Sequence, residues 1–392
     1  MVFELEKFTK NPKALNAYVY EEEIRKILLK SNNELFQATI GELPKGVNSK
    51  VTIKTTLGNI TVPKSHSMAA HPMGFYMSPK LQEHMCRLGS KMVFSEASEE
   101  FWQFLEQDIS DKQIERVCHC YGEKLDELDW NNAFSDSIQL KLYHKKEEDV
   151  YVMVDGSMLL TRENGWKEIK VGRVFGSNSM VDISKNRTLL SNSVYSAHFG
   201  NAANFWERFS AEIPQSNRLV FINDGARWIW KHIEECYPGS VQILDFFHCK
   251  EHIYQFTKDF FSNRNKQIEF AERTCNLLLN EQVDEALDKI RQLDANTKKK
   301  CSAKEKLLKY LENNKNRINY GNFKKRGFLI GSGAIESAQR DVIQKRMKLS
   351  GQRWTKAGAQ QIINLRVYKK SDRWQRVINC INGVYNINKS AA

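Results

Sequence analysis

Two short apolar runs in this chain each end in an aspartate, and they constrain its fold more than any other feature of the sequence. Residues 150–154 lead directly into Asp155, and residues 219–223 lead into Asp224. Such runs are typical of strands that are buried within a sheet. An aspartate directly after a buried strand lies at the rim of the sheet, where metal and phosphate chemistry is usually built. The sequence therefore predicts a sheet with at least two carboxylates at its rim.

The strand and helix signals that follow residue 150 alternate in a definite order. Asn164-Gly165 separates two strand-like runs and is a strong hairpin signal. Three more strands are predicted at 189–195, 218–223 and 241–244, and helices are predicted at 201–213, 226–236 and from 248 onward. The resulting order, β-β-β-α-β-α-β-α, is that of the ribonuclease H-like core. We therefore predict a mixed α/β fold built on such a core.

A helical insertion is predicted within this core. Residues 241–320 contain neither Gly nor Pro, and beyond the fifth strand Leu and Ile recur at helical spacing among mixed charges. The predicted divisions are the catalytic core at 148–250 plus 326–370, an all-α insertion at 251–325, and a C-terminal tail without a clear element at 371–392.

Two smaller regions are predicted ahead of the core. Residues 1–77 form an N-terminal region with a β-hairpin that turns near Leu57-Gly58. Residues 78–128 show three successive amphipathic patterns and predict a small helical, helix-turn-helix-like domain. A unit of this size suits a DNA reader, and small helical bundles that contact only protein are at least as common.

Basic residues are concentrated near the end of the chain. The net charge is +12, and residues 321–370 hold twelve Lys or Arg against two acidic residues. Such a cluster favours a polyanionic partner, of which DNA or RNA is the commonest.

No stretch is apolar for long enough to cross a bilayer, and the first residues lack a signal-peptide pattern. We therefore expect a cytoplasmic, nucleoid-associated protein with no membrane partner. The eight cysteines include no C-x-x-C pair, which argues against a zinc ribbon.

A third carboxylate, Glu336, lies inside this basic segment, in a helix predicted to start at the Gly-Ser-Gly sequence 331–333. Cutting or transferring a phosphodiester needs an activated oxygen nucleophile and a stabilised leaving oxygen, and two divalent ions provide both. Hard cations of this kind prefer carboxylate ligands. We therefore predict that Asp155, Asp224 and Glu336 hold two Mg²⁺ or Mn²⁺ ions, with Asp155 bridging them.

Basic and aromatic side chains follow Glu336 along the sequence. Lys and Arg neutralise phosphates and release counterions, and a Trp stacks on unpaired bases when it is exposed. For Trp354 the alternative interpretation is packing in a core. The side chains that we predict to bind DNA are Arg340, Lys345, Arg346, Lys348, Arg353, Trp354 and Lys356.

Blocks of sequence around these acids carry a family resemblance. They lie at 154–157, 223–229, 245–248 and 331–337, followed by 350–354. In these blocks the chain resembles DDE transposases of bacterial insertion sequences, especially the group related to Mutator-like elements and the Kra-type insertion sequences. The resemblance spans residues 150–370, and more loosely 78–128.

This resemblance implies a ribonuclease H-like fold, Mg²⁺ dependence, and the three carboxylates named above as metal ligands. It also implies cutting of double-stranded DNA at transposon ends and strand transfer into target DNA, by a homo-oligomer in a synaptic complex. Asp245 and His248 match the family's D-x-x-H element. That match implies a place near the scissile phosphate or a positioning role.

Two other functions are compatible with parts of the sequence. Residues 248–252 fit H-x-x-E-H, the inverted zinc-protease motif, with His248 and His252 on one helix face and Glu251 as the base. That motif is short and leaves the three carboxylates and the basic segment unexplained. A DNA-binding regulator without catalysis would use residues 78–128 and the basic segment, with the core kept only as a scaffold.

Overall fold

The computed structural model describes residues 17–40, 49–66, 68–69, 73–130, 148–184 and 187–384. The chain divides into two compact units. Unit 1 consists of Met1–Leu128 together with Gln360–Ala392, and unit 2 of Asp129–Ala359. Parts of the predicted N-terminal region and of the predicted C-terminal tail lie outside the described residues.

Unit 1 contains the predicted hairpin and the three predicted helices. The hairpin is antiparallel, with Ile53 opposite Ile60 in its buried face. The Ser78 hydroxyl caps the first of the three helices by accepting from Leu81 N. The elements of unit 1 are α2 (Ala17–Ile40), β1 (Lys50–Thr55), β2 (Gly58–Pro63), α3 (Pro79–Gly89), α4 (Phe94–Leu105), α5 (Asp111–Trp130), the part of α16 (Lys356–Lys370) from Gln360 onward, and α17 (Trp374–Ile381).

Helix α17 was not predicted from the sequence. Trp374, Val377 and Ile381 are buried and recur at helical spacing, so they form one apolar face. The Trp374 indole donates from Nε1 to Glu83 Oε1 of α3 at 3.2 Å. The region assigned as a tail therefore contains a helix that packs into unit 1.

Gly122 allows α5 and α16 to approach closely. A Cβ atom at Gly122 would lie 2.2 Å from the backbone oxygen of Gln361. The Asn364 side chain donates from Nδ2 to the Gly122 carbonyl at 2.9 Å across the same contact. The backbones therefore touch where any larger residue would separate them.

We expect Gly122→Ala to destabilise unit 1 by about 1–3 kcal/mol, because the added methyl group forces the two helices apart. Urea unfolding measures the change. Gly239→Ala is the control, because a Cβ atom there meets nothing within 4 Å. Equal stability of the two variants would contradict the close approach.

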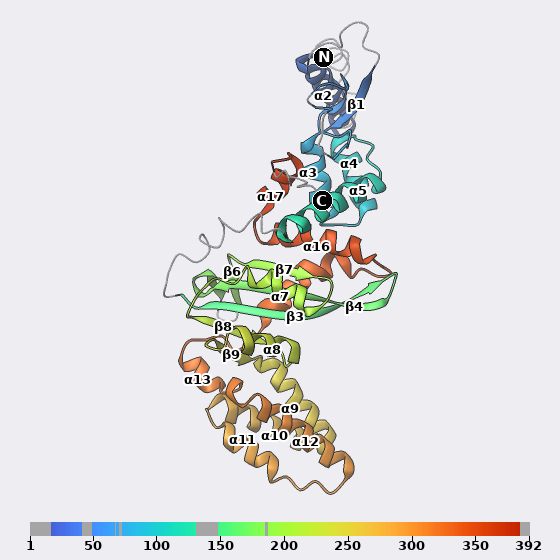
Figure 1. The fold of residues 1–392 in the computed structure, drawn as a ribbon. Helices are drawn as coiled ribbons and strands as arrows, with labels where there is room; N and C mark the ends of the chain where they lie inside the picture. Colours follow the sequence, from blue (N-terminus) through green and yellow to red (C-terminus); the bar gives the residue numbers. More distant parts are fainter. Residues whose placement is uncertain are drawn as a thin grey trace. The chain divides into compact units, whose positions relative to one another are not determined.

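Unit 2 is built around a five-stranded mixed sheet, so the protein has a mixed α/β fold (Figure 1). The strand order is β7-β4-β3-β8-β9. Strand β3 pairs antiparallel with β4 and parallel with β8, β8 pairs parallel with β9, and β4 pairs antiparallel with β7. The strands are β3 (Val150–Thr161), β4 (Gly165–Gly176), β7 (Val194–His198), β8 (Leu219–Asn223) and β9 (Val241–Leu244).

One strand prediction was wrong. The segment 189–195 does not form a single strand, because the polar sequence 191–193 interrupts it. Its first part belongs to β6 (Arg187–Leu190), which pairs with β5 (Met180–Ser184) in a separate two-stranded sheet. Its last part begins β7, the third strand of the main sheet counted from β3 along the chain.

Helices cover the two faces of the main sheet. A Cβ atom at Gly172 of β4 would meet the Phe209 ring of α7 at 2.5 Å, and Trp206 of α7 stacks on His232 of α8 at 4.1 Å between ring centroids. Adjacent residues of a strand point to opposite faces, so Arg173 points away from α7. It hydrogen-bonds with α14 on the other face. The helices are α7 (Ala202–Ser210), α8 (Arg227–Cys236) and α14 (Gly333–Ala338).

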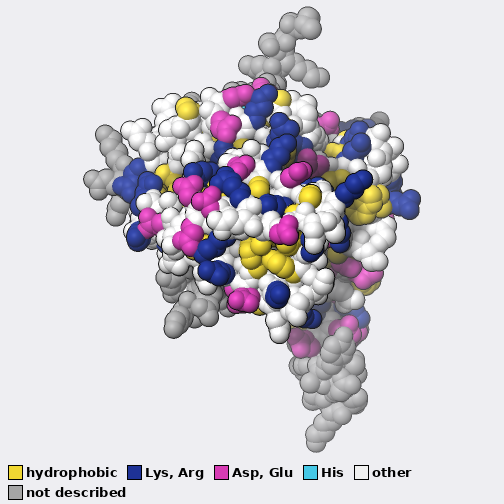
Figure 2. Space-filling model, turned by 90° about the horizontal axis from the view of Figure 1, so that it is seen from below, with side chains coloured by type: hydrophobic (Ala, Val, Ile, Leu, Met, Phe, Trp, Pro, Cys, Tyr) yellow, Lys and Arg dark blue, Asp and Glu magenta, His cyan; other side chains and the backbone are white. Residues whose placement is uncertain are grey.

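The predicted insertion is helical throughout its described length. Its helices gather into one bundle below the sheet (Figure 1). At the surface seen from below, Lys and Arg mix with Asp and Glu, and hydrophobic side chains form small groups (Figure 2). The helices are α9 (Phe246–Phe260), α10 (Arg264–Leu279), α11 (Val283–Arg291), α12 (Lys298–Asn313) and α13 (Tyr320–Lys325).

No helix among the described residues combines the length and the apolar character that a bilayer crossing requires.

Candidate active site

Asp155 and Asp224 lie where β3 and β8 stop pairing. The parallel register between the two strands ends at Val152 and Phe221, and β3 then continues beside β4 alone. Asp155 therefore lies inside β3 and not at its end, but it lies beyond the last residue of β3 that pairs with β8. The fully buried side chain of Asn223 extends the contact, because its Oδ1 accepts from Val154 N at 2.6 Å. Sequence reasoning missed Asn223, although a polar residue within a buried run is a recognisable signal.

The environment of Asp155 disfavours its charged form. Burial is the main cause, and the neighbouring Asp224 carboxylate is the next, so that the pKa of Asp155 is raised to about 6. A hydrogen bond from Gly156 N to Oδ1, at 2.7 Å, acts in the opposite direction. A buried carboxyl group whose ionisation a second carboxylate disfavours forms a site that a cation would stabilise.

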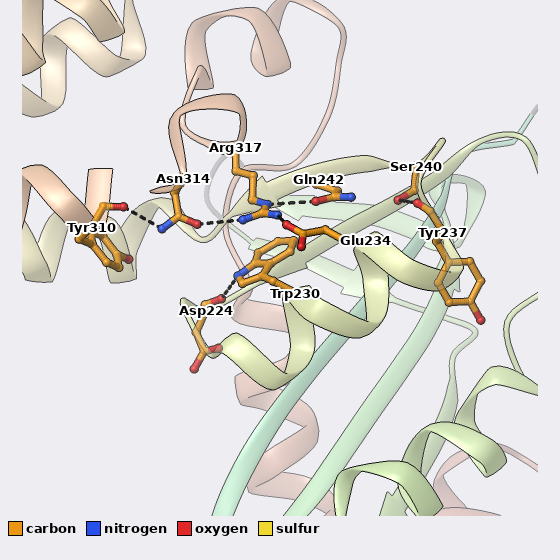
Figure 3. Close-up of polar contacts among 9 residues, drawn as sticks. All are labelled: Asp224, Trp230, Glu234, Tyr237, Ser240, Gln242, Tyr310, Asn314 and Arg317. Atoms are coloured by element: carbon orange, nitrogen blue, oxygen red, sulfur yellow. Dashed lines mark hydrogen bonds and ion pairs between the residues drawn. The ribbon is translucent and has the colours of Figure 1, made fainter. Parts of the chain in front are cut away.

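Asp224 begins the turn into α8, and its backbone is held firmly. Its Oδ1 accepts from Ala226 N at 3.0 Å, and its carbonyl accepts from Trp230 Nε1 at 2.7 Å. The Arg317 guanidinium lies over the Trp230 ring, 4.3 Å from its centroid. Figure 3 shows the Asp224 carboxylate pointing away from this indole, so the network holds the backbone and leaves the carboxylate available.

Arg317 links three elements behind Asp224 (Figure 3). It donates from Nε to Gln242 of β9 at 3.0 Å, from Nη1 to Asn314 at 3.2 Å, and pairs through Nη2 with Glu234 of α8. Asn314 in turn donates to the Tyr310 carbonyl at 2.8 Å, so the contact continues into α12. The insertion is therefore connected to β9 and to α8, the helix whose Trp230 holds the Asp224 carbonyl.

Glu336 lies in α14, and two buried side chains fix that helix. Asp245 accepts from the backbone N–H of Ser332 through Oδ2 and from that of His248, at 2.7 Å, through Oδ1. Arg173 donates from Nη1 to the Ala334 carbonyl at 2.8 Å. Ser332 is the N-cap residue of α14, but its side chain makes no capping hydrogen bond.

Asp155 and Glu336 line the same cleft, which has a volume of about 580 Å³. Arg340 and Lys348 line it as well. Desolvation lowers the pKa of the Lys348 ammonium group, and the Asp155 carboxylate in the same cleft opposes that effect. Asp224 is not part of this lining, although its charge acts on Asp155. The cleft therefore combines acids with basic side chains of the kind that bind phosphate.

Asp245 is 2% exposed, so it is a buried positioning residue rather than a residue open to substrate in this structure. We expect Asp245→Ala to destabilise unit 2 by about 2–4 kcal/mol, because the N-cap of α9 is lost and the Ser332 N–H stays buried without a partner. Chemical denaturation measures this change.

The control for this prediction is Asn263→Ala, which removes the N-cap contact to Lys266 N on α10, far along the insertion sequence. The free energy of unfolding of that variant should fall by about 1 kcal/mol, which is the usual contribution of an N-cap side chain. A loss no larger for Asp245→Ala would show that the contact to Ser332 contributes little.

The segment after Glu336 contains a π-helical turn, η3 (Gln339–Gln344), between α14 and the short α15 (Lys345–Met347). Such turns are rare and are frequent at functional sites. Of the side chains predicted to bind DNA, five are exposed: Arg340, Lys345, Lys348, Arg353 and Lys356. Lys345 pairs with Asp341 at 2.7 Å.

The other two predicted DNA-binding side chains are buried. Arg346 is 1% exposed and Trp354 is 7% exposed. The guanidinium of Arg346 lies 5.0 Å from the Trp354 ring centroid, and the indole donates from Nε1 to the Met347 carbonyl at 3.0 Å. In this structure they pack against each other, and neither presents a surface to DNA. Such burial is the alternative that the sequence left open for Trp354.

The side chains of the H-x-x-E-H motif lie on α9. His248 Nδ1 is 3.8 Å from Glu251 Oε2, and the His248 and His252 rings are 4.9 Å apart between centroids. His252 also stacks on Tyr310 of α12 at 4.1 Å. Burial is the main cause that lowers the pKa of His252, and the adjacent His248 adds to it. His252 therefore packs between α9 and α12 within the insertion.

No ready-made metal centre is found among the described residues, because no three His, Cys, Asp or Glu side chains there are close enough to hold one ion. The donor chemistry nevertheless fits a hard divalent cation at the carboxylates. Asp224 raises the pKa of the Asp155 carboxyl group, and Glu336 lines the same cleft as Asp155. Carboxylate oxygens are the ligands that Mg²⁺ prefers.

Comparison with protein-family models and with curated proteins gave no match for this chain.

Proposed function

We propose that this chain is a DNA transposase that cuts phosphodiester bonds at transposon ends and joins them to target DNA. One observation carries the proposal: Asp155, whose pKa is raised to about 6 by burial and by Asp224, shares a cleft with Glu336. These are the three acids that match the DDE pattern, and they come from three segments far apart in sequence. Perturbed carboxylates in a cleft mark candidate catalytic sites.

The element order supports a ribonuclease H-like core. From β3 to α9 the chain follows β-β-β-α-β-α-β-α once the small sheet of β5 and β6 is set aside. The helical insertion then separates α8 from α14 in sequence. Asp245 and Arg173 hold the returning helix against the sheet, and this supports the proposal by fixing the helix that brings Glu336 to the cleft lined by Asp155.

The residues divide the chemistry among them. Asp155, Asp224 and Glu336 would hold divalent cations, which supply an activated oxygen nucleophile and stabilise the leaving oxygen when bound. Lys348 and Arg340 neutralise phosphate oxygens in the cleft. Attack of water on the phosphorus breaks one P–O ester bond and leaves a 3′-hydroxyl and a 5′-phosphate. Attack of that 3′-hydroxyl on target DNA then forms one ester bond and releases another 3′-hydroxyl.

The proposed partners are double-stranded DNA at transposon ends and at the target, and a second copy of the chain in a synaptic complex. Arg353 and Lys356 extend the exposed basic surface beyond the cleft. They would add contacts to the DNA backbone, which carry affinity but no sequence information. DNA binding should therefore weaken steeply as salt is raised.

The test is cleavage of duplex DNA that carries the inverted repeats flanking the gene, with Mg²⁺ or Mn²⁺ as the only divalent ion. The proposal expects cuts at the repeat ends and transfer of the cut strand to a second duplex. Binding without cleavage under all these conditions would favour the non-catalytic regulator. Proteolysis that needs zinc and is lost in Glu251→Gln would favour the zinc protease.

A further inference from the structure

The carboxylates of Asp155 and Asp224 are each fixed through one oxygen. In both residues Oδ1 accepts from a nearby backbone N–H, that of Gly156 at 2.7 Å and that of Ala226 at 3.0 Å. Within the part of the chain that the structure describes, neither Oδ2 atom accepts a hydrogen bond. A carboxylate oxygen accepts more than one hydrogen bond, so each Oδ2 can take a side-chain donor and still serve as a ligand.

A buried amide lies beside Asp155. Gln339 is 4% exposed, begins the π-helical turn and lines the cleft. Its side chain acts on Asp155 as a hydrogen-bond donor that lowers the pKa of that carboxyl group, although neither Nε2 nor Oε1 reaches full hydrogen-bond geometry with any partner. Buried polar groups in folded proteins are nearly always paired, so an unpaired amide beside a catalytic acid calls for an explanation.

A buried hydroxyl lies beside Asp224 in the same way. Tyr310 belongs to α12 of the insertion, and its Oη atom is buried without a partner. A Cβ atom built on Gly225, the residue after Asp224, would lie 3.6 Å from this Oη atom. The tyrosine ring stacks on His252, which fixes its position. The hydroxyl is therefore held near the start of α8 with its hydrogen-bonding capacity unused.

We propose that Gln339 and Tyr310 are positioning residues for the two aspartates, Gln339 donating from Nε2 to Asp155 and Tyr310 donating from Oη to Asp224 in the working site. Each donor is buried and unpaired, and each lies beside one of the two carboxylates that lack a second donor. Such outer contacts orient metal-binding carboxylates. The inference rests on the proposed function, and it assigns the insertion a role in orienting Asp224.

The test uses Tyr310→Phe and Gln339→Met, which remove the donor with little change in volume. Because the lost group is buried and unpaired, the thermal unfolding midpoint should stay the same or rise. The Mn²⁺ concentration that gives half of the maximal thermal stabilisation, measured without DNA, should rise about 10–100-fold. Cleavage at low Mn²⁺ should fall by a similar factor and recover at high Mn²⁺.

Two matched controls separate positioning from packing. Tyr320→Phe removes a hydroxyl that is also buried but interacts with the Cys249 thiol instead of with either aspartate of the site. Gln344→Met removes an exposed amide from the same π-helical turn and the same cleft. Both controls should bind Mn²⁺ and cleave DNA as the wild-type chain does.

The outcomes distinguish this inference from the proposed function. If Asp155→Asn is inactive while Tyr310→Phe and Gln339→Met bind Mn²⁺ and cleave normally, only the positioning inference is overturned. If the wild-type chain is neither stabilised by Mn²⁺ nor able to cleave DNA, both proposals are overturned. Weaker Mn²⁺ binding in the two variants and not in the controls supports the inference.

Discussion

Replacing Asp155, Asp224 or Glu336 by its amide should lower Mg²⁺-dependent cleavage by more than about 100-fold, because loss of a direct ligand exceeds the 10- to 100-fold cost of losing an outer contact. An amide keeps the shape of the side chain but loses the charge that attracts the cation. Steady-state cleavage of a labelled duplex measures the loss. DNA affinity, measured in Ca²⁺ at fixed salt, should change little, because phosphate contacts come mainly from Lys and Arg.

Glu235→Gln is the matched control for this set. Glu235 lies on α8, is exposed, and forms a long 3.9 Å ion pair with Lys231. It tests whether loss of one negative charge is enough to change cleavage. Normal cleavage by any of the three site variants would exclude that residue as a ligand. Loss of cleavage in the control as well would indicate a general electrostatic effect.

The two aspartates could be predicted from the sequence because local signals carry them. Each follows a run of apolar residues whose burial requires a sheet, and parallel neighbours bring such positions together. The structure adds that Asp155 lies within β3, since the strand continues as a hairpin with β4 after β8 ends. A pattern of side chains indicates where burial ends but not where pairing ends.

The placement of Glu336 depends on contacts that no local pattern reveals. Asp245 and Arg173 reach α14 from residues 87 and 161 positions away in sequence, and both are buried polar side chains. The burial of Arg346 and Trp354 is likewise a tertiary effect. In the sequence, a basic residue and a nearby aromatic residue are equally compatible with an exposed DNA-binding surface and with a buried pair. Composition therefore overestimated how many cations of this segment face solvent.

The same limit applies to Gln339 and Tyr310. Neither belongs to a motif, and one comes from a π-helical turn that has no simple sequence signature. Their significance lies in polar atoms that are buried without a hydrogen-bond partner, and only the folded structure reveals such atoms. Unpaired buried polar groups lower stability, so their presence at one site is typical of a trade between stability and function.

Asp155→Asn should stabilise the metal-free protein at pH 8, by an amount on the order of 3 kcal/mol. The folded protein holds the Asp155 proton up to about pH 6, whereas the ordinary value is 3.8. A raised carboxyl pKa means that stability falls as pH rises between these values, and the full cost remains above pH 6. Asparagine never ionises, so the advantage of the variant should shrink to roughly half at pH 5.

Urea unfolding in EDTA at pH 5 and pH 8 tests this expectation, and Asp224→Asn serves as a partial control. Burial is the first cause of the raised pKa and the Asp224 charge only the second, so removing Asp224 should recover the smaller part of the stabilisation. Added Mn²⁺ should narrow the gap, because a cation that binds the ionised wild-type site stabilises only that protein. A variant less stable than wild type at pH 8 would instead mean that the hydrogen bond from Gly156 N to the carboxylate outweighs the cost of its burial.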